Sequence, residues 1–383
     1  MTCRLIWDTA LAQTTETFKV LRESLEVISA SNIAEHLHGA VRILASVMQV
    51  QRFEIAVQSL DNCRAHLTAA LAIFQQLLDS CSKGGEAAGP APRFRAVVER
   101  LGPPMWILPT GCAPFPSAEQ AAFRFSSALL VFDDIIASTV LQEEPTLYEY
   151  HDSLLGKTDA GGEEPLIDLE PVVGCHNCVM RLIGEVAVLD AWKQRSRRAG
   201  NLDMMELVRR ATVTKDALEE YLDLLASYPA VPGYDTNLVD VFRPDYWQRS
   251  EPPASQTTVV TRVWTHAALL YLSVVVSGWQ PAGAEARHHV GRVLELLGEV
   301  APPAMLRAAA WPFCVAVCLA MCGRQDRFRD MVGALRPTAV FGTLLKALEV
   351  MEGVWRDGGA TWDAETRDLA DCFRGHGDLV LLV

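Results

Sequence analysis

The stretch VVGCHNCVM at residues 172–180 holds two cysteines in the spacing that zinc sites and redox pairs use. A structural zinc site needs four ligands, and the next cysteine after Cys178 is Cys314. A redox pair would open a helix that follows a strand, and no alternation of strands and helices precedes Cys175. The pattern therefore favours two packed thiols at a helix start, with Gly174 supplying the turn.

A second set of cysteines, Cys314, Cys318 and Cys322, recurs every four residues within AAAWPFCVAVCLAMC, so the three thiols share one face of a helix. Three thiols in register could bind a soft metal ion. The small apolar residues around them explain them as core residues, and no metal ligand is assigned here.

Asp133 and Asp134 suggest a different chemistry, because aspartates on a helix hold magnesium and diphosphate in terpenoid cyclases. Such a site needs carboxylates at i and i+4 that face one cavity, but position 137 is alanine. Asp134 also lies roughly opposite the apolar face of its helix, and no second Asn/Asp-x-x-Ser/Thr-x-x-x-Glu motif follows. We expect two solvated aspartates, with a terpenoid-cyclase type of enzyme that uses Asp133 and Asp134 as the alternative.

Other catalytic patterns are missing from the sequence. It contains no Gly-x-Ser-x-Gly, no Gly-x-Gly-x-x-Gly and no Gly-x-x-x-x-Gly-Lys-Ser/Thr motif. The close histidine pairs, His36 with His38 and His288 with His289, lack the i,i+4 spacing of a metal-binding helix. We therefore assign no catalytic residue, no cofactor and no metal.

Lys193, Arg195, Arg197 and Arg198 form the one basic run of the chain. It is compatible with a nuclear import signal or a phosphate contact, and a solvated helix end with cations near the negative end of the helix dipole is the simpler interpretation. The whole chain carries 34 basic against 47 acidic residues, a net charge of -13. Such a charge repels phosphate backbones, so we do not expect this chain alone to bind DNA directly.

The composition is that of a large protein with its own core, with 383 residues of which 50% are hydrophobic. Ten cysteines are spread from Cys3 to Cys372, which predicts reduced thiols in the nucleus or cytosol. The N-terminal residues resemble neither a secretory leader nor an import peptide. The uncharged stretch 263–284 is long enough to span a membrane but contains His266 and Pro281, so we expect a buried helix.

Apolar residues recur at three and four positions rather than at two, which predicts an all-α protein with a large multi-helix domain. Helices are expected at 121–141, 179–193, 205–227 and 338–355. Ser117 and Gln120 form a capping box before the first of them. Its predicted apolar face consists of Phe125, Leu129, Phe132, Ile136 and Val140, and that of the helix at 179–193 consists of Val179, Leu182, Val186 and Leu189.

Clusters of proline and glycine mark the linkers, and the first two lie at about 83–117, where they could form a hinge. The predicted helices before residue 82 have apolar faces too broad to leave in water. We therefore predict one packed helical domain over residues 1–383, with that hinge inside it.

The order of the helical segments resembles the regulatory domain of fungal zinc binuclear cluster transcription factors, of the branch found beside secondary-metabolite gene clusters. The resembling stretches include LHGAVRILASV, AAFRFSSALLVFDDIIAS, IDLEPVVGCHNCVMRLIGEVAVLDAWK, AAWPFCVAVCLAMCGRQDRFRDMV and FGTLLKALEVMEGVW. The resemblance implies that six residues are signature packing positions of the family: Gly174, Cys175, Asn177, Trp192, Trp311 and Pro312. Similar proteins carry an aromatic residue, usually Trp, where this chain has Cys178, so the Cys-x-x-Cys spacing is incidental.

Proteins of this kind begin with six cysteines that hold two zinc ions and read DNA, whereas here Cys3 is followed by no cysteine until Cys63. The resemblance thus implies a regulatory domain without its zinc cluster, or a gene model truncated upstream. We expect a nuclear transcriptional regulator of a secondary-metabolite cluster, not an enzyme, whose partner is a DNA-bound transcription factor or a second copy. A pocket for a hydrophobic small-molecule ligand is compatible with this, and an inhibitory partner of a full-length paralogue is a further alternative.

Overall fold

The computed structural model describes residues 19, 35–56, 63–81, 89–103, 116–156, 165–227, 256–300, 306, 308–335, 342–357 and 368–374. Every regular element among these residues is helical, which confirms the all-α prediction. The helices are α2 (Leu37–Ala56), α3 (Cys63–Asp79), α4 (Pro90–Arg100), α5 (Ala118–Leu141), the 3-10 helix η1 (Tyr148–Tyr150), α6 (His151–Leu154), α7 (Glu170–Val173), α8 (Asn177–Arg198), α9 (Met204–Ser227), α10 (Gln256–Ser277), α11 (Ala284–Glu299), α12 (Ala310–Cys318), α13 (Cys322–Ala334), α14 (Gly342–Asp357) and α15 (Leu369–Arg374).

The contacts between residues divide the chain into two compact units. Unit 1 consists of Met1–Asp134 and Thr146–Asp168, and unit 2 consists of Ile135–Pro145 and Leu169–Val383. Helix α5 contributes to both units, because the boundary follows Asp134. Within the hinge expected at about 83–117, residues 90–100 form helix α4, whereas 83–88 and 104–115 lie outside the described residues. The single packed domain stays a prediction.

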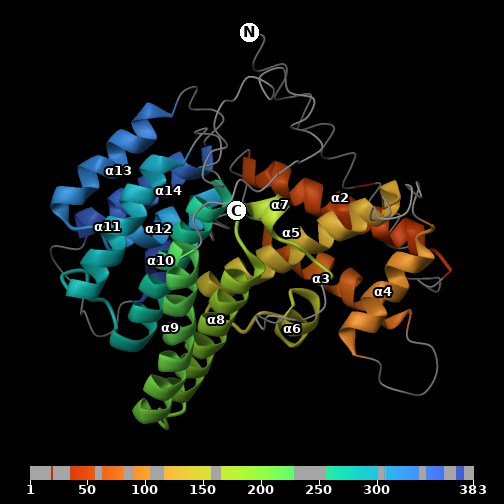
Figure 1. Cartoon of the computed structure of the whole chain (residues 1–383), viewed down its shortest axis with the longest axis horizontal. Coiled ribbons are helices and arrows are strands. Elements are labelled where there is room, and N and C mark those ends of the chain that lie inside the picture. The colour runs from red at the N-terminus through yellow and green to blue at the C-terminus, as the bar shows by residue number, and fades with distance from the viewer. Residues whose placement is uncertain are drawn as a thin grey trace. The chain divides into compact units, whose positions relative to one another are not determined.

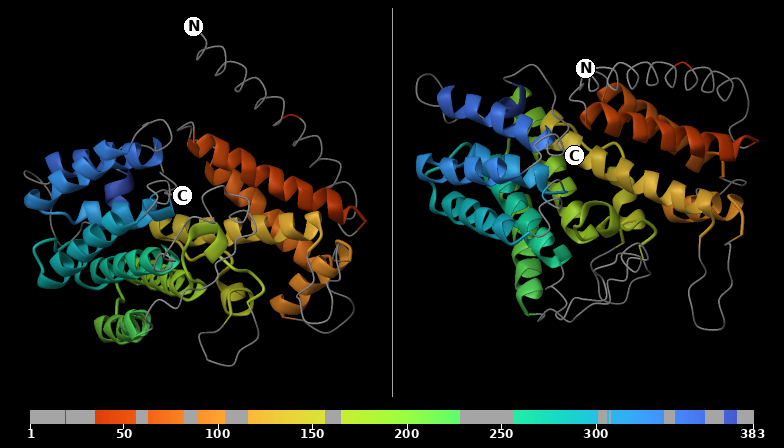
Figure 2. Two further views of the ribbon diagram at one scale, coloured as in Figure 1. Left: turned by 45° about the horizontal axis from the view of Figure 1, so that its top comes forward. Right: turned by 90° about the horizontal axis from the view of Figure 1, so that it is seen from above.

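The core of unit 1 is built on three phenylalanines from three successive helices. Phe74 of α3, Phe94 of α4 and Phe123 of α5 are fully buried. Their ring centroids lie 5.0 to 6.4 Å apart, within the range of favourable aromatic pairs. Helix α2 packs along α3 beside this cluster (Figure 2).

The capping box predicted before α5 is confirmed. The Ser117 backbone N–H donates to Gln120 Oε1 at 2.9 Å, and the Gln120 backbone N–H donates to Ser117 Oγ at 3.2 Å. Gln120 Nε2 also donates to the carbonyl oxygens of Val98 and Gly102, at 3.0 and 2.7 Å. The start of α5 is thereby tied to the end of α4, where Gly102 has a φ of +115° that favours glycine.

The apolar face predicted for α5 is wrong in its first half. Phe125 is 55% exposed, and Phe123 points into the core instead. From residue 130 to residue 140 every side chain is buried, so this part of α5 has no solvent face and no single apolar stripe.

The core of unit 2 surrounds α10, which contacts α8, α9, α11 and α12 (Figure 1). This helix is long and apolar enough to cross a membrane, and 83% of that apolar window is buried inside the protein. The prediction of a buried helix is confirmed for residues 263–277, whereas residues 278–283 form a partly exposed turn before α11. The predicted apolar face of α8 is also confirmed, because four residues on it are buried: Val179, Leu182, Val186 and Leu189.

Candidate functional site

Three of the predicted packing positions meet in the turn between α7 and α8. Gly174 ends α7 with a φ of +67°, and its N–H donates to the carbonyl oxygen of Glu170 at 2.8 Å. Asn177 begins α8, and its Oδ1 accepts the backbone N–H of Leu169 at 2.8 Å. The amide thus ties the chain before the turn to the helix after it.

Cys175 lies in the same turn with its thiol fully buried against Thr261 of α10. Burial raises the pKa of Cys175 well above its usual value, which keeps the thiol protonated and unreactive. His176 follows, and its Nδ1 lies 2.6 Å from the hydroxyl oxygen of Tyr221 on α9. These groups bind α7, α8, α9 and α10 together, and their surroundings favour packing over thiol chemistry.

Asp133 and Asp134 are both buried, so the prediction of two solvated aspartates is wrong. Asp133 Oδ1 accepts Nη2 of Arg52 at 2.6 Å. Asp134 accepts the backbone N–H groups of Thr146 and Leu147, at 3.1 and 2.8 Å. Burial raises the pKa of each carboxyl to about 6, opposed at Asp133 by Arg52 and at Asp134 by the two backbone donors.

The sequence pattern placed Asp134 on the outer face because it assumed that one side of α5 meets solvent. Instead the carboxylate organises the chain that returns after α5, by accepting two backbone donors from residues 146 and 147. A carboxylate with both oxygens bonded to backbone N–H groups is a structural acceptor, poorly placed to coordinate magnesium.

Trp311 and Pro312 lie in the first turn of α12, where a proline costs no helical hydrogen bond. Trp311 is fully buried and stacks on Trp264 of α10, with ring centroids 5.4 Å apart and planes 6° from parallel. Its Nε1 donates to Oγ1 of Thr139 at 2.9 Å. A third ring, Tyr271, meets Trp311 edge-on at 6.0 Å.

The aromatic stack is joined through Tyr271 to a buried carboxyl group, that of Asp190. The hydroxyl of Tyr271 donates to Oδ2 of Asp190 on α8 at 3.1 Å, and Nε2 of Gln194 lies 3.3 Å from Oδ1. Burial is the main cause that raises the pKa of Asp190, and the nearby carboxylate of Asp368 raises this pKa further. The arrangement ties α8 to α10, and the sequence alone gave no indication of it.

His266 of α10 and His289 of α11 form a buried pair, with Nδ1 atoms 3.0 Å apart. Burial is the main cause that lowers the pKa of His266 to about 3 and that of His289 to about 4. Both rings are therefore neutral near neutral pH, and one donates its N–H to the other. Spacing could not predict this pair, because its members come from different helices.

Cys314 and Cys318 are buried in α12, and burial raises the pKa of the Cys314 thiol above its usual range. The side chain of Cys322 lies outside the described part of the chain. Within the described residues, no group of three or more His, Cys, Asp or Glu is arranged to hold a metal ion.

An apolar crevice in unit 2 is closely packed and leaves no internal space for a water-sized molecule. It is lined by Leu297, Leu306, Phe313, Met331, Val332, Leu335 and Leu344. Ligand pockets typically enclose roughly 300–1,000 Å³, so the crevice is not a preformed pocket for a metabolite.

The basic run ends α8, with Arg195, Arg197 and Arg198 in its last turn. This placement agrees with a solvated helix end. Lys193 differs, because its Nζ is half-buried and donates to the carbonyl oxygen of Val275 at 2.5 Å. Trp192 lies three residues before Arg195 on α8. The guanidinium of Arg210 lies over the ring of Trp192, with Cζ 4.8 Å from the ring centroid.

The joined ends of α8 and α9 extend beyond the other helices of unit 2 (Figure 1). Asp203 caps α9, because its Oδ1 accepts the backbone N–H groups of Met205 and Glu206 at 2.9 and 3.1 Å. The carboxylate of Glu206 accepts Nε and Nη2 of Arg209 at 2.7 and 2.9 Å and Nε of Arg210 at 2.5 Å. Arg209 first, then Arg210, lowers the pKa of Glu206 to about 2.

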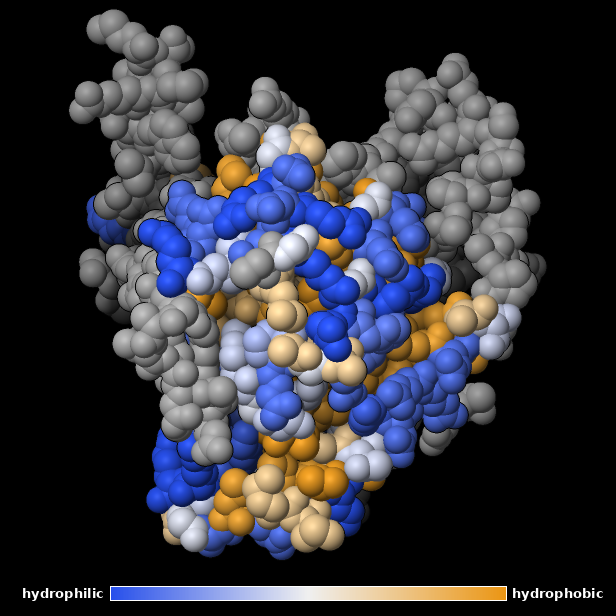
Figure 3. Space-filling view, turned by 90° about the vertical axis from the view of Figure 1, so that its left-hand side faces the viewer, coloured by the Kyte–Doolittle hydropathy of each residue, from blue (hydrophilic) through white to orange (hydrophobic). Residues whose placement is uncertain are grey.

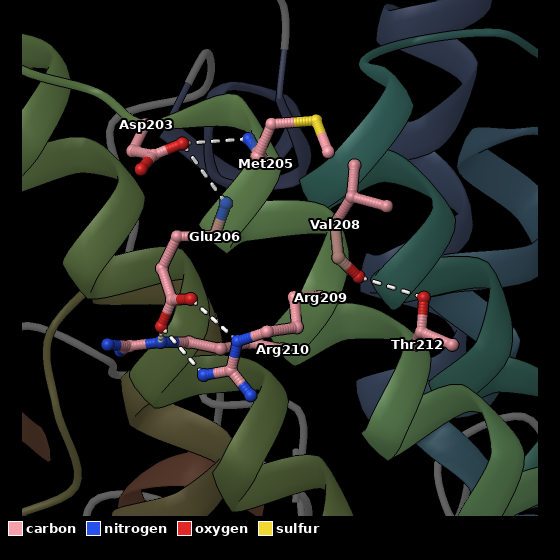
Figure 4. A network of polar contacts seen from close by, with 7 residues as sticks. All are labelled: Asp203, Met205, Glu206, Val208, Arg209, Arg210 and Thr212. Atoms are coloured by element: carbon pink, nitrogen blue, oxygen red, sulfur yellow. Dashed lines mark hydrogen bonds and ion pairs between the residues drawn. The ribbon is translucent and has the colours of Figure 1, made fainter.

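These contacts leave apolar side chains in water. Met204 is 51% exposed, Met205 80% and Val208 46%. Met205 and Val208 point to one side of the first turns of α9, while Glu206, Arg209 and Arg210 gather on another (Figure 4). Apolar surface also lies at the lower end of the molecule in Figure 3, with hydrophilic surface on both sides of it.

The comparison with protein families matches residues 13–372 to the fungal-specific transcription factor domain. The chain belongs to this family. It is similar to the transcription factor dibT of Pestalotiopsis microspora, with 34% identity over 99% of this chain and 59% of that protein. It is also similar to the ustiloxin B cluster transcription factor ustR of Aspergillus flavus, with 25% identity over 81% of this chain and 49% of that protein.

A third similar protein is the trichothecene biosynthesis transcription regulator TRI10 of Fusarium sporotrichioides, with 26% identity over 94% of this chain and 79% of that protein. No solved structure matches the chain. The chain thus spans about half to three fifths of the first two relatives, dibT and ustR.

The joined ends of α8 and α9 are a described surface where exposed apolar side chains lie beside exposed arginines. Sequence reasoning missed it, although a signal was present. The pair Met204 and Met205 lies outside the buried stripe of α9, which runs through Leu207, Ala211 and Leu218, and the short loop 199–203 separates it from the basic run.

Proposed function

We propose that this chain is the regulatory part of a transcriptional regulator that controls a fungal secondary-metabolite gene cluster from within the nucleus. The observation that carries the proposal is the family match over residues 13–372. Similar proteins named for the ustiloxin B cluster and for trichothecene biosynthesis support the link to secondary metabolism.

The chain acts through protein contacts in this proposal. Its partner is a DNA-bound transcription factor or a second copy of the chain. The small size of the apolar crevice favours protein contacts over a hydrophobic small-molecule ligand as the means of regulation. The exposed methionines at the start of α9 offer a surface for such contacts.

The enzyme alternative receives less support. Asp133 and Asp134, the residues on which it depended, are buried and bonded to Arg52 and to backbone N–H groups. The inhibitory-partner alternative requires the same kind of surface as the proposed regulator. The two therefore differ only in whether the chain raises or lowers transcription of the cluster genes.

Deletion of the gene in its native fungus tests the proposal, with transcripts measured across the neighbouring biosynthetic genes. We expect these transcripts to fall together in the deletion strain and to recover on complementation. A coordinated rise would favour the inhibitory alternative, and unchanged transcripts would contradict both. A fluorescent fusion that stays outside the nucleus would contradict the proposed location.

A further inference from the structure

We infer that the joined ends of α8 and α9 form a docking surface for an acidic, amphipathic helical segment of a partner protein. The surface, here called the hairpin tip, consists of Arg197, Arg198, Met204, Met205, Val208 and Arg209. The inference deepens the proposed function and rests on it for the statement that the partner is a regulatory protein. The chemistry of binding is argued from the residues of the hairpin tip alone.

The apolar part of the hairpin tip is more than scattered exposure. Single exposed apolar residues are common on protein surfaces and need no explanation. Here Met204, Met205 and Val208 all lie within the first turns of one helix, at 51%, 80% and 46% exposure. Helical spacing places them within about 100° of one another around the axis. Methionine side chains adapt well to an apolar partner because they are unbranched and polarisable.

The backbone beneath these side chains is fixed before any partner binds. Asp203 caps the helix, and Glu206 accepts hydrogen bonds from both Arg209 and Arg210. Arg210 is held a second time, over the ring of Trp192 at 4.8 Å. A partner that binds here therefore loses less free energy to ordering than it would on a loop.

The charge of the hairpin tip selects an acidic partner. Residues 195–213 contain five arginines against two acidic residues, in a chain whose net charge is -13. Arg195 pairs with Glu144 at 3.4 Å, and both acidic residues of the segment, Asp203 and Glu206, are occupied within α9. The charges of Arg197 and Arg198 are therefore not offset by these two carboxylates. Two hairpin tips brought together would set arginine against arginine, which disfavours a second copy at this surface.

An acidic helix with leucine-like residues on one face satisfies both parts of the hairpin tip. Its apolar side chains would cover Met204, Met205 and Val208, while its carboxylates would pair with Arg197 and Arg198. Nucleic acid fits less well, because three apolar side chains between the arginines offer nothing to a phosphate backbone.

The test uses the full chain and a labelled peptide of about 16 residues with glutamates on one face and leucines on the other. Fluorescence anisotropy measures its affinity. Two comparison peptides replace the glutamates by lysines or the leucines by serines, and a DNA duplex is a further probe. We expect the acidic peptide to bind and each comparison peptide to bind at least about tenfold more weakly.

Variants then locate the binding site. Met205→Ser combined with Val208→Ser, and Arg197→Glu combined with Arg198→Glu, should each weaken binding about tenfold or more. Leu224→Ser is the matched apolar control, since Leu224 is 45% exposed on α9 but lies about 24 Å further along the helix from Val208. Arg327→Glu on α13, also exposed, is the matched charge control. Both controls should stay within about twofold of the unmodified chain.

The inference is overturned if the hairpin-tip variants bind the acidic peptide as the controls do, or if the lysine peptide or the DNA duplex binds equally well. Such a result leaves the proposed function standing when deletion still changes the cluster transcripts. Conversely, specific binding at the hairpin tip together with unchanged transcripts would support the docking surface and contradict the proposed function.

Discussion

Replacing Asp134 by alanine tests whether this carboxyl is a structural acceptor, as the structure indicates, or a ligand of magnesium. The substitution removes the acceptor for the backbone N–H groups of Thr146 and Leu147. Leu147 is fully buried, so water does not easily replace the lost partner there. An unsatisfied buried donor costs about 1–3 kcal/mol, and we expect Asp134→Ala to destabilise the chain by about 2–4 kcal/mol near pH 5.

The effect of Asp134→Ala on the free energy of unfolding should depend on pH, and the pKa of Asp134 sets the direction of this dependence. The pKa of Asp134 is raised from 3.8 to about 6 in the folded chain, so the folded state binds the proton first as the pH falls. Stability from this group therefore rises as the pH falls through about 6, and most of the gain is present near pH 4. Between about pH 7.5 and pH 5 the gain is on the order of 1 kcal/mol, which the alanine variant lacks.

The assay is urea unfolding followed by circular dichroism at both pH values, with Asp223→Ala as the control. Asp223 is exposed on α9, and its replacement should change the free energy of unfolding by less than about 0.5 kcal/mol. The reasoning is refuted if Asp134→Ala behaves like this control at both pH values. A magnesium-dependent affinity of the unmodified chain for a prenyl diphosphate would instead restore the enzyme alternative.

Three further predictions follow from buried groups in unit 2. Trp311→Phe should lower the free energy of unfolding by about 1–3 kcal/mol, measured in urea, because it removes a hydrogen bond and part of a stacked ring. The pKa values of His266 and His289, lowered to about 3 and about 4, mean that stability is lost as the pH falls below about 6.5. His289→Gln should reduce that loss in thermal melts taken across the pH range, and an unchanged pH profile would contradict this. Cys178, which is partly exposed, should react with maleimide faster than buried Cys175 in the native chain, as peptide mass spectrometry would measure; equal rates would show that the thiol of Cys175 is accessible.

Predictions from local spacing succeeded where one face of a helix meets solvent. The capping box of Ser117 and Gln120 depends on residues three apart, and the structure contains it. The stripe of α8 is likewise buried as expected. The same reasoning failed on α5, where Phe125 is exposed and Asp134 is buried. Periodicity assumes a fixed core side, and α5 is surrounded on all sides between residues 130 and 140.

The sequence by itself determined that the chain is helical and which family it resembles. Helix periodicity, caps and the order of apolar segments are carried by neighbouring residues, so they can be read before folding. The tertiary structure decided which polar groups are buried and which apolar groups are exposed. Trp311 meets Thr139 across 172 positions, and Arg52 meets Asp133 across 81. Contacts at such separations, like the exposure of Met205, depend on how helices pack together, which no local pattern of residues specifies.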